Sequence, residues 1–161
     1  MTTGPFTDVA MARGSDGIYD LVIDATSRDL TTVSGLQTPL LCSLFSDRRA
    51  ESSECADPMK RRGWIGNLLS EVPADNYGSG LWLYEQRRGT PDVLALLRME
   101  VLSSLHWLIE DGLATQMDAV LAYDPQTRRV VITVTVTDAV DGSRKSYQLW
   151  KASGSGLLGS N

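Results

Sequence analysis

Residues 130–137, Val-Val-Ile-Thr-Val-Thr-Val-Thr, constrain the fold more than any other part of the sequence. β-Branched residues favour strands, and successive side chains of a strand point to opposite faces. Ile132, Val134 and Val136 therefore point one way, and the threonines that follow them point the other way. The alternation predicts a strand with one buried face.

Flanking segments extend this strand into a predicted three-stranded antiparallel sheet. Residues 116–123 form the preceding strand, and Asp124-Pro125 marks a turn. Asp141-Gly142 is a strong hairpin signal, because the tight turns of hairpins need residues that tolerate positive φ. The third strand is predicted at residues 147–151, with Trp150 near its end.

The clearest helix is preceded by Thr90 as a cap, begins at Pro91 and is stopped by Gly112. Its length corresponds to about six turns at 3.6 residues per turn. Shorter helices are predicted at residues 38–47 and 80–88. The inner stripe of the long helix steps by three or four residues and comprises Leu94, Leu97, Val101, Leu105 and Leu108.

These elements predict an α+β fold. We expect a small single domain with an N-terminal strand at residues 17–24, two to four helices including a long core helix, and a C-terminal three-stranded antiparallel sheet. A chain of 161 residues is long enough for one such domain with its own core. The domain is expected to span residues 17–151, between a flexible N-terminus at 1–16 and a flexible Gly/Ser tail at 152–161.

Composition argues against several function classes. The formal net charge is -5, so nucleic acid is not an expected partner. No stretch approaches the roughly 20 apolar residues that span a bilayer, and no basic segment leads into an apolar one near residue 1, so neither a membrane span nor a secretory signal is expected. Cys42 and Cys55 with the single histidine, His106, do not form a metal-binding spacing, and no metal or cofactor is expected.

The sequence assigns no catalytic residue. His106 lies on the long helix without a recognisable nucleophile, and a lone helical histidine is more often structural. The carboxylates, such as Glu51 and Glu54, are placed like solubilising surface charge.

Arginine pairs are concentrated in an irregular loop, residues 46–77, and just after it. They are Arg48-Arg49, Arg61-Arg62 and Arg87-Arg88, with Trp64 and Trp82 nearby in the sequence. Arg and Trp are favoured anchors of protein interfaces. A solvated charged loop whose tryptophans turn inward explains the pattern equally well.

Four short motifs occur in a characteristic order. They are Leu44-Phe45-Ser46-Asp47-Arg48-Arg49-Ala50; Asp57 with Arg61-Arg62-Gly63-Trp64-Ile65-Gly66-Asn67; Gly78-Ser79-Gly80-Leu81-Trp82; and His106-Trp107-Leu108-Ile109-Glu110-Asp111-Gly112. The order resembles the Mu-like contractile-phage baseplate proteins of the tail sheath initiator family, over about residues 17–151. Many members have a second tryptophan where Ile65 stands here. The Glu-Pro-Arg triplet of their secretion-system relatives is absent.

The resemblance implies a structural role in a phage tail baseplate, with a distant relation to lysozyme-like baseplate wedge proteins and their type VI secretion counterpart. Such a protein docks onto wedge proteins and onto tube or hub proteins, and starts sheath assembly when its sheet accepts a strand of the tail sheath protein. The protein would be located in the tail baseplate of the virion, with multiple copies in a symmetric assembly, and in the host cytoplasm during assembly. The interface residues expected on this basis are Asp47, Arg48, Arg49, Arg61, Arg62, Trp64, Ile132, Val134, Tyr147 and Trp150.

Two alternatives come from other function classes. One is a tail-associated, lysozyme-like enzyme that cleaves peptidoglycan, although no acid pair can be assigned to it. The other is a soluble adaptor or chaperone outside virions.

Overall fold

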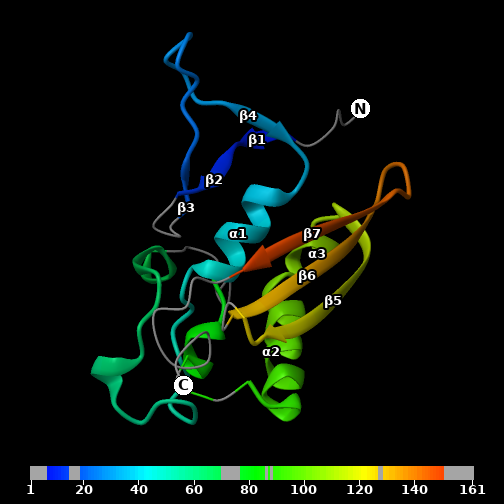
Figure 1. The fold of residues 1–161 in the computed structure, drawn as a ribbon. Coiled ribbons are helices and arrows are strands. Elements are labelled where there is room, and N and C mark those ends of the chain that lie inside the picture. The colour runs from blue at the N-terminus through cyan, green and yellow to red at the C-terminus, as the bar shows by residue number, and fades with distance from the viewer. Residues whose placement is uncertain are drawn as a thin grey trace. The chain divides into compact units, whose positions relative to one another are not determined.

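A computed structural model describes residues 7–14, 19–69, 77–85, 87, 89–126 and 129–150 (Figure 1). The chain forms two compact units, residues 1–41 and 42–161. The predicted α+β class is confirmed, with strands near the N-terminus, a long helix and a C-terminal antiparallel sheet of three strands.

Four short strands build the first unit: β1 (Thr7–Val9), β2 (Met11–Arg13), β3 (Tyr19–Leu21) and β4 (Thr32–Ser34). β1 pairs with β4 and β2 pairs with β3, both antiparallel. Ala10 joins the two pairings, because its N–H donates to Thr31 O and its carbonyl accepts from Val22 N. The segment from β1 to β2 therefore runs across the base of a hairpin.

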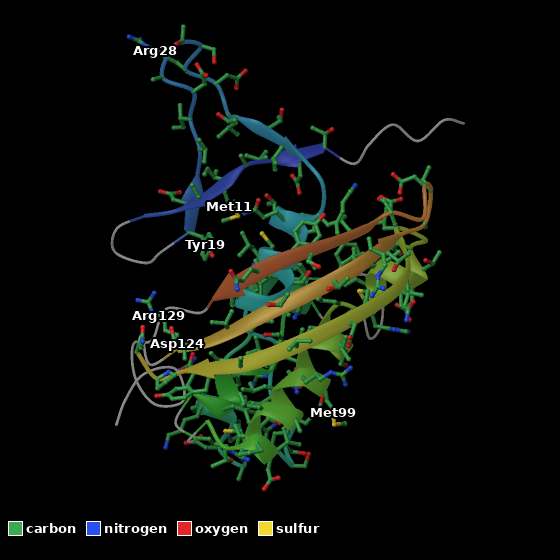
Figure 2. All side chains as sticks on the ribbon, turned by 45° about the vertical axis from the view of Figure 1, so that its right-hand side comes forward. Met11, Tyr19, Arg28, Met99, Asp124 and Arg129 are labelled. Carbon is green, nitrogen blue, oxygen red and sulfur yellow. The ribbon has the colours of Figure 1, made fainter. Side chains whose placement is uncertain are left out.

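The tip of this hairpin is an Asp-centred turn. One carboxylate oxygen of Asp24 accepts hydrogen bonds from the backbone N–H groups of Thr26 and Ser27, at 2.8 and 2.7 Å. These bonds hold the pKa of Asp24 below its ordinary value. Arg28, labelled at the tip in Figure 2, has a positive φ of 59°.

Two findings in this unit differ from the expectations. Of the strand predicted at residues 17–24, residues 17 and 18 lie outside the described residues, β3 covers Tyr19–Leu21, and only an isolated bridge between Ile23 and Leu30 continues it. Residues 7–13 of the segment 1–16 hold β1 and β2, while residues 1–6, 15 and 16 and the expected tail at 152–161 lie outside the described residues, so the flexibility expected of both ends stays a prediction. The strand structure of β1 and β2 comes from tertiary pairing, which local composition does not reveal.

The second unit contains the C-terminal sheet, in the order β5 (Ala114–Asp124), β6 (Arg129–Asp138) and β7 (Arg144–Trp150). Both pairings are antiparallel, so the prediction for this region is confirmed. Alternate residues of β6 face the core, and these are Val130, Ile132, Val134 and Val136, all at most 3% exposed. Gly142 has a positive φ of 68° in the β6–β7 turn, as the hairpin signal indicates.

Two helices cover one face of this sheet, α2 (Pro91–Ser104) and α3 (Trp107–Glu110) (Figure 1). Between them the predicted helix of six turns is interrupted. The Ser104 hydroxyl donates to Glu100 O, and His106 N bonds to Ser103 O in a tighter turn. Serine side chains that bond back to the preceding turn compete with the helical ladder, and adjacent serines often end or bend helices.

The remaining helices are α1 (Gln37–Phe45) and three 3₁₀ turns, η1 (Pro58–Lys60), η2 (Ile65–Leu68) and η3 (Leu81–Tyr84). α1 matches the predicted helix at 38–47 within two residues. The described residues of the helix predicted at 80–88 form only η3, and Gly80 at its start offers no side-chain cap.

Burial is strongest in the second unit. The fully buried or nearly buried apolar residues there are Leu44, Ala50, Leu81, Leu97, Val101, Leu105, Leu108, Ala114, Ala119, Val130, Ile132, Val134, Val136 and Leu149. Four of the five residues of the predicted helical stripe are among them, and Leu94 is half-buried. Within the described residues, no helix has the length and apolarity to cross a bilayer.

Candidate interaction surface

Arg48 ties the loop that follows α1 to helix α2. Its Nη2 lies 2.8 Å from Glu54 Oε1, and its Nε lies 2.9 Å from Glu100 Oε1. Glu100 Oε1 also accepts the Gly80 N–H at 2.6 Å, and the Trp82 indole N–H donates to Arg48 O at 2.9 Å. Arg48 and Glu100 together therefore connect the loop after α1, the segment 80–82 and helix α2.

The electrostatics agree with this geometry. Bonds from the Arg48 guanidinium, together with the Glu51 N–H, lower the pKa of Glu54 to about 2. Bonds to Glu54 and then to Glu100 raise the pKa of Arg48 further above its ordinary value. The side chain of Arg48 is 21% exposed, so its charge is mostly engaged inside the chain.

Arg62 makes a second internal cluster. Its guanidinium pairs with Asp47 at 3.3 Å and with Glu85 at 3.2 Å. It also lies over the Trp82 ring, 4.9 Å from the ring centroid. Asp47 and Arg62, both expected at an interface, are therefore brought together by the fold and bind one another.

Arg61 and Arg49 contact backbone carbonyls of the same loop. Arg61 Nε donates to Cys55 O at 2.7 Å, which closes the loop around η1. Arg49 is exposed, and its contacts with Arg62 O and Pro58 O are both 3.4 Å long. Arg49 therefore differs from Arg48, Arg61 and Arg62, because all of its described contacts are long bonds to backbone carbonyls on the surface.

Large apolar side chains, instead of free cations, dominate the outside of this loop. Met59 is 92% exposed, Trp64 51%, Ile65 72% and Leu69 78%. The Trp64 ring leans on Tyr77, with ring centroids 5.1 Å apart, and covers Gly66 so closely that no Cβ fits there. We call the group Arg49, Met59, Trp64, Ile65 and Leu69 the loop surface.

Sequence reasoning found Arg49 and Trp64 of this surface and missed its aliphatic members. Ile65 departs from the family pattern, and an isoleucine between Trp64 and Gly66 is itself an apolar signal. The acidic partners Glu54, Glu85 and Glu100 were also missed, because ion pairs formed between distant segments leave no local pattern.

The sheet residues expected at the interface fall into two groups. Ile132 and Val134 lie on β6, the central strand, where both backbone edges are paired and both side chains are buried at 3% and 0% exposure. The structure corrects the expectation for these two residues, because neither offers a surface to a partner. Tyr147 and Trp150 lie on the edge strand β7, and the Trp150 side chain is outside the described residues.

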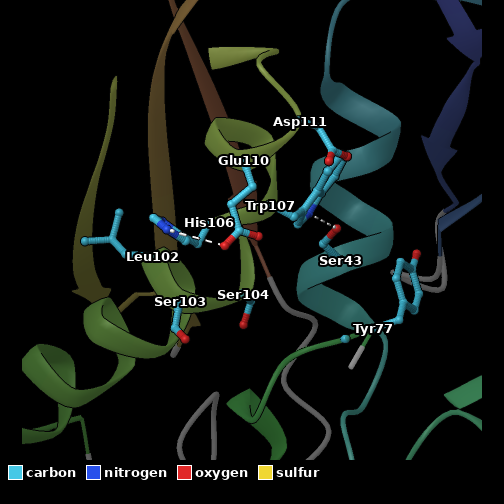
Figure 3. Close-up of a pocket in the computed structure, with 10 residues that line it drawn as sticks. Ser43, Tyr77, Leu102, Ser103, Ser104, His106, Trp107, Glu110 and Asp111 are labelled. Carbon is cyan, nitrogen blue, oxygen red and sulfur yellow. Dashed lines mark hydrogen bonds and ion pairs between the residues drawn. The ribbon is translucent and has the colours of Figure 1, made fainter. Parts of the chain in front are cut away.

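A polar pocket of about 850 Å³ opens beside α3 (Figure 3). His106 Nε2 lies 3.8 Å from a Glu110 carboxylate oxygen, and the Trp107 indole N–H donates to Ser43 Oγ at 3.2 Å. Tyr77 also lines the pocket, and its pKa is raised to about 12, mainly by burial. The lining of the pocket comprises Ser43, Tyr77, Gly78, Leu102, Ser103, Ser104, His106, Trp107, Glu110 and Asp111.

The pocket does not assemble a metal site. Across the described residues, no three His, Cys, Asp or Glu side chains converge on a point that could hold a metal ion. His106 remains mostly exposed at 62%, and its nearest acid is its helical neighbour Glu110. The sequence did not indicate this pocket, because it is built from segments separated by up to about seventy residues.

Comparisons with known proteins agree with the resemblance found in the sequence. The family model described as phage protein GP46 matches residues 36–144. Baseplate protein gp46 of Escherichia phage Mu is 36% identical over 108 residues, covering 66% of this chain and 70% of that protein. Mu-like prophage FluMu protein gp46 of Haemophilus influenzae is 29% identical over 128 residues, covering 80% and 84%. The chain therefore belongs to the GP46 family of Mu-like phage baseplate proteins.

Proposed function

We propose that this protein is a structural component of a phage tail baseplate, located in the virion. It docks onto wedge and tube proteins through the loop surface, and its C-terminal sheet accepts a strand of the sheath protein, which starts sheath assembly. The name of the Mu relative supports the baseplate role. The observation that carries the docking role is a loop cross-linked by arginines that still exposes four large apolar side chains.

The cross-links prepare the loop for binding. Arg48, Arg61 and Arg62 fix its backbone through carboxylates, carbonyls and the Trp82 ring before any partner arrives. A preorganised surface loses less conformational entropy on association, so more of the contact free energy remains as affinity. Exposed apolar groups beside a cation are typical of interface anchors with a polar rim.

Strand acceptance rests on the sheet. β5, β6 and β7 form an open sheet with two edges, and an edge strand carries backbone donors and acceptors that a partner strand can bond. Main-chain bonds of this kind need little side-chain complementarity. They suit a component that must start a repeating polymer.

The loop is tested by charge placed among its apolar side chains. In the phage that carries this protein, Ile65→Asp with Leu69→Asp is expected to leave the purified protein folded, because both residues are exposed, and to exclude it from tails. Mass spectrometry of purified particles measures its incorporation, and thermal unfolding measures its fold. Contractile tails with normal amounts of the double variant would contradict docking through this loop.

Met99→Asp is the matched control. Met99 is 66% exposed, close to the value for Ile65, but it lies on the outer side of α2 (Figure 2). Its variant should enter tails normally.

The proposal assigns no catalytic step, so clearing of peptidoglycan by the purified protein in a zymogram would favour the enzyme alternative instead.

A further inference from the structure

We propose that the strand-accepting edge is the outer edge of β7, not that of β5, and that the strand it takes is acidic. This inference rests on the strand acceptance proposed above and names its site and the charge of its partner. The argument depends on which backbone groups point outward at each edge and on what already binds them.

The outward groups of β7 follow from its register. Asp138 N donates to Ser143 O at 2.8 Å, so residues 138 and 143 form a hydrogen-bonded pair. In an antiparallel ladder such pairs alternate with non-bonded ones, and both backbone groups of a residue point to the same side. Counting along the β6–β7 register, Lys145, Tyr147 and Leu149 bond β6. Ser146 and Gln148 therefore direct their N–H and C=O groups away from the sheet.

The same alternation identifies the outward groups of β5. Residues 132, 134 and 136 of β6 bond β7, so residues 131, 133 and 135 bond β5. Their partners are Ala122, Val120 and Asp118, which leaves Ala119 and Leu121 pointing outward. Ala119 is the residue nearest the middle of this edge.

Both outward groups of Ala119 are already bound by side chains of its own chain. Arg98 Nε of α2 donates to Ala119 O at 2.8 Å, and Asp118 Oδ1 accepts the Ala119 N–H at 2.8 Å. Arg98 Nη2 also lies 2.7 Å from Asp118 Oδ1, so the two side chains that bind Ala119 are paired with each other. We call this arrangement the Arg98–Asp118 clasp. A strand that paired with β5 would have to displace it.

Within the part of the chain that the structure describes, the β7 edge has no equivalent clasp. Among the described residues, no side chain bonds the outward backbone groups of Ser146 or Gln148, and both residues are exposed. The Ser146 hydroxyl instead contacts Thr135 Oγ1 at 3.0 Å on the outer face of the sheet. An incoming strand therefore meets free backbone donors and acceptors here.

Charge near the start of β7 indicates the chemistry of the partner. Arg144 and Lys145 are both exposed, and Lys145 reaches Asp138 only at 3.8 Å. Lysines and arginines on an edge disfavour pairing with neutral or cationic strands and attract carboxylates placed opposite them. Arg144 lies on the outer face of the sheet with Ser146, whereas Lys145 points to the opposite face. The partner strand is therefore one whose acidic side chains lie on the outer face, opposite Arg144.

Amide hydrogen exchange tests the edge directly. The probe is a ten-residue peptide of alternating Val and Glu added to the full-length protein, and a Val/Lys peptide is the control. We expect the Val/Glu peptide to slow exchange of the Ser146 and Gln148 amides at least tenfold, with the Ala119 and Leu121 amides unchanged. Protection on β5, equal protection by both peptides, or no protection would overturn the proposal. Slow exchange at Ser146 and Gln148 without peptide would also overturn it, because residues 151–161 or a second copy would then cover the edge.

Two proline variants separate this inference from the proposed function. Gln148→Pro removes an outward N–H of β7 without breaking its ladder with β6, and Tyr123→Pro does the same on β5. We expect tails with Gln148→Pro to contain the protein but to lack sheath, and tails with Tyr123→Pro to be sheathed. Sheath loss with Tyr123→Pro alone would contradict the β7 assignment and preserve strand acceptance. Normal sheath with both variants would contradict strand acceptance itself.

Discussion

The arginine loop and the C-terminal sheet reach defined structures by different means. The sheet is held by two long backbone ladders and by a buried face, and in both the residues alternate with a period of two. The loop has short 3₁₀ turns and is held mainly by a few specific links, above all those of Arg48 and Arg62. We therefore expect the loop to depend on single residues far more than the sheet does.

The largest expected effect is that of Arg48→Glu. The change breaks the pairs with Glu54 and Glu100 and places a third carboxylate beside them. Breaking a buried pair costs about 3 to 5 kcal/mol, and we expect about 2 to 3 kcal/mol here because Arg48 keeps some solvent exposure. Urea unfolding measures the loss.

Arg49→Glu is the matched control, since it makes the same change at the next residue. Arg49 is exposed and has only long contacts with carbonyls, so its free energy of unfolding should stay within about 0.5 kcal/mol of the wild-type value. Arg49→Glu should instead reduce incorporation into tails. Equal losses of stability in the two variants would show that Arg48 does not hold the loop.

A pair of glycines compares the two regions at a smaller scale. Gly78 and Gly142 both have positive φ, at 104° and 68°. A Cβ at Gly78 would lie 2.8 Å from Ser46 O, whereas nothing lies within 4 Å of one at Gly142. We expect Gly142→Ala to cost about 1 kcal/mol, the usual penalty of a left-handed residue, and Gly78→Ala to cost about 2 kcal/mol or more.

Thermal and urea unfolding of both alanine variants measure this difference. It arises because the Gly78 backbone is pressed against the chain at residues 46–48, while the Gly142 turn faces open space. The comparison fails if Gly142→Ala proves the more destabilising of the two, because close approach would then contribute nothing.

Much of the sheet could be predicted from the sequence, and little of the loop. The alternation at residues 130–137 gives the buried face of β6, and Asp141-Gly142 gives its hairpin. The partner of Arg48 on α2, by contrast, is 52 residues away and leaves no periodic trace. The same holds for the Arg98–Asp118 clasp, which becomes visible only when α2 is placed beside β5.

The long helix lies between these cases. Its leucine stripe correctly predicts Leu97, Val101, Leu105 and Leu108 as buried. The interruption after Ser104 was missed, although the adjacent serines Ser103 and Ser104 are a sequence signal for it. The leucine stripe masks this signal because it continues in phase across the break.

A dependence of stability on pH also belongs to the loop. Hydrogen bonds from Arg48 and the Glu51 N–H lower the pKa of Glu54 from 4.5 to about 2. Because the folded-state pKa lies below the unfolded one, the stability that Glu54 contributes is present above about pH 4.5 and is lost as the pH falls toward 2. Glu54→Gln should therefore flatten the fall in unfolding free energy across that range, measured by urea unfolding at several pH values. Glu51→Gln is the control, because Glu51 is an exposed residue of the same loop whose backbone N–H, not its carboxylate, contacts Glu54, and it should change the slope less. A slope that Glu54→Gln does not alter would mean that the Arg48–Glu54 pair contributes no net stability in solution, and the loop would then depend on Glu100 and Arg62 alone.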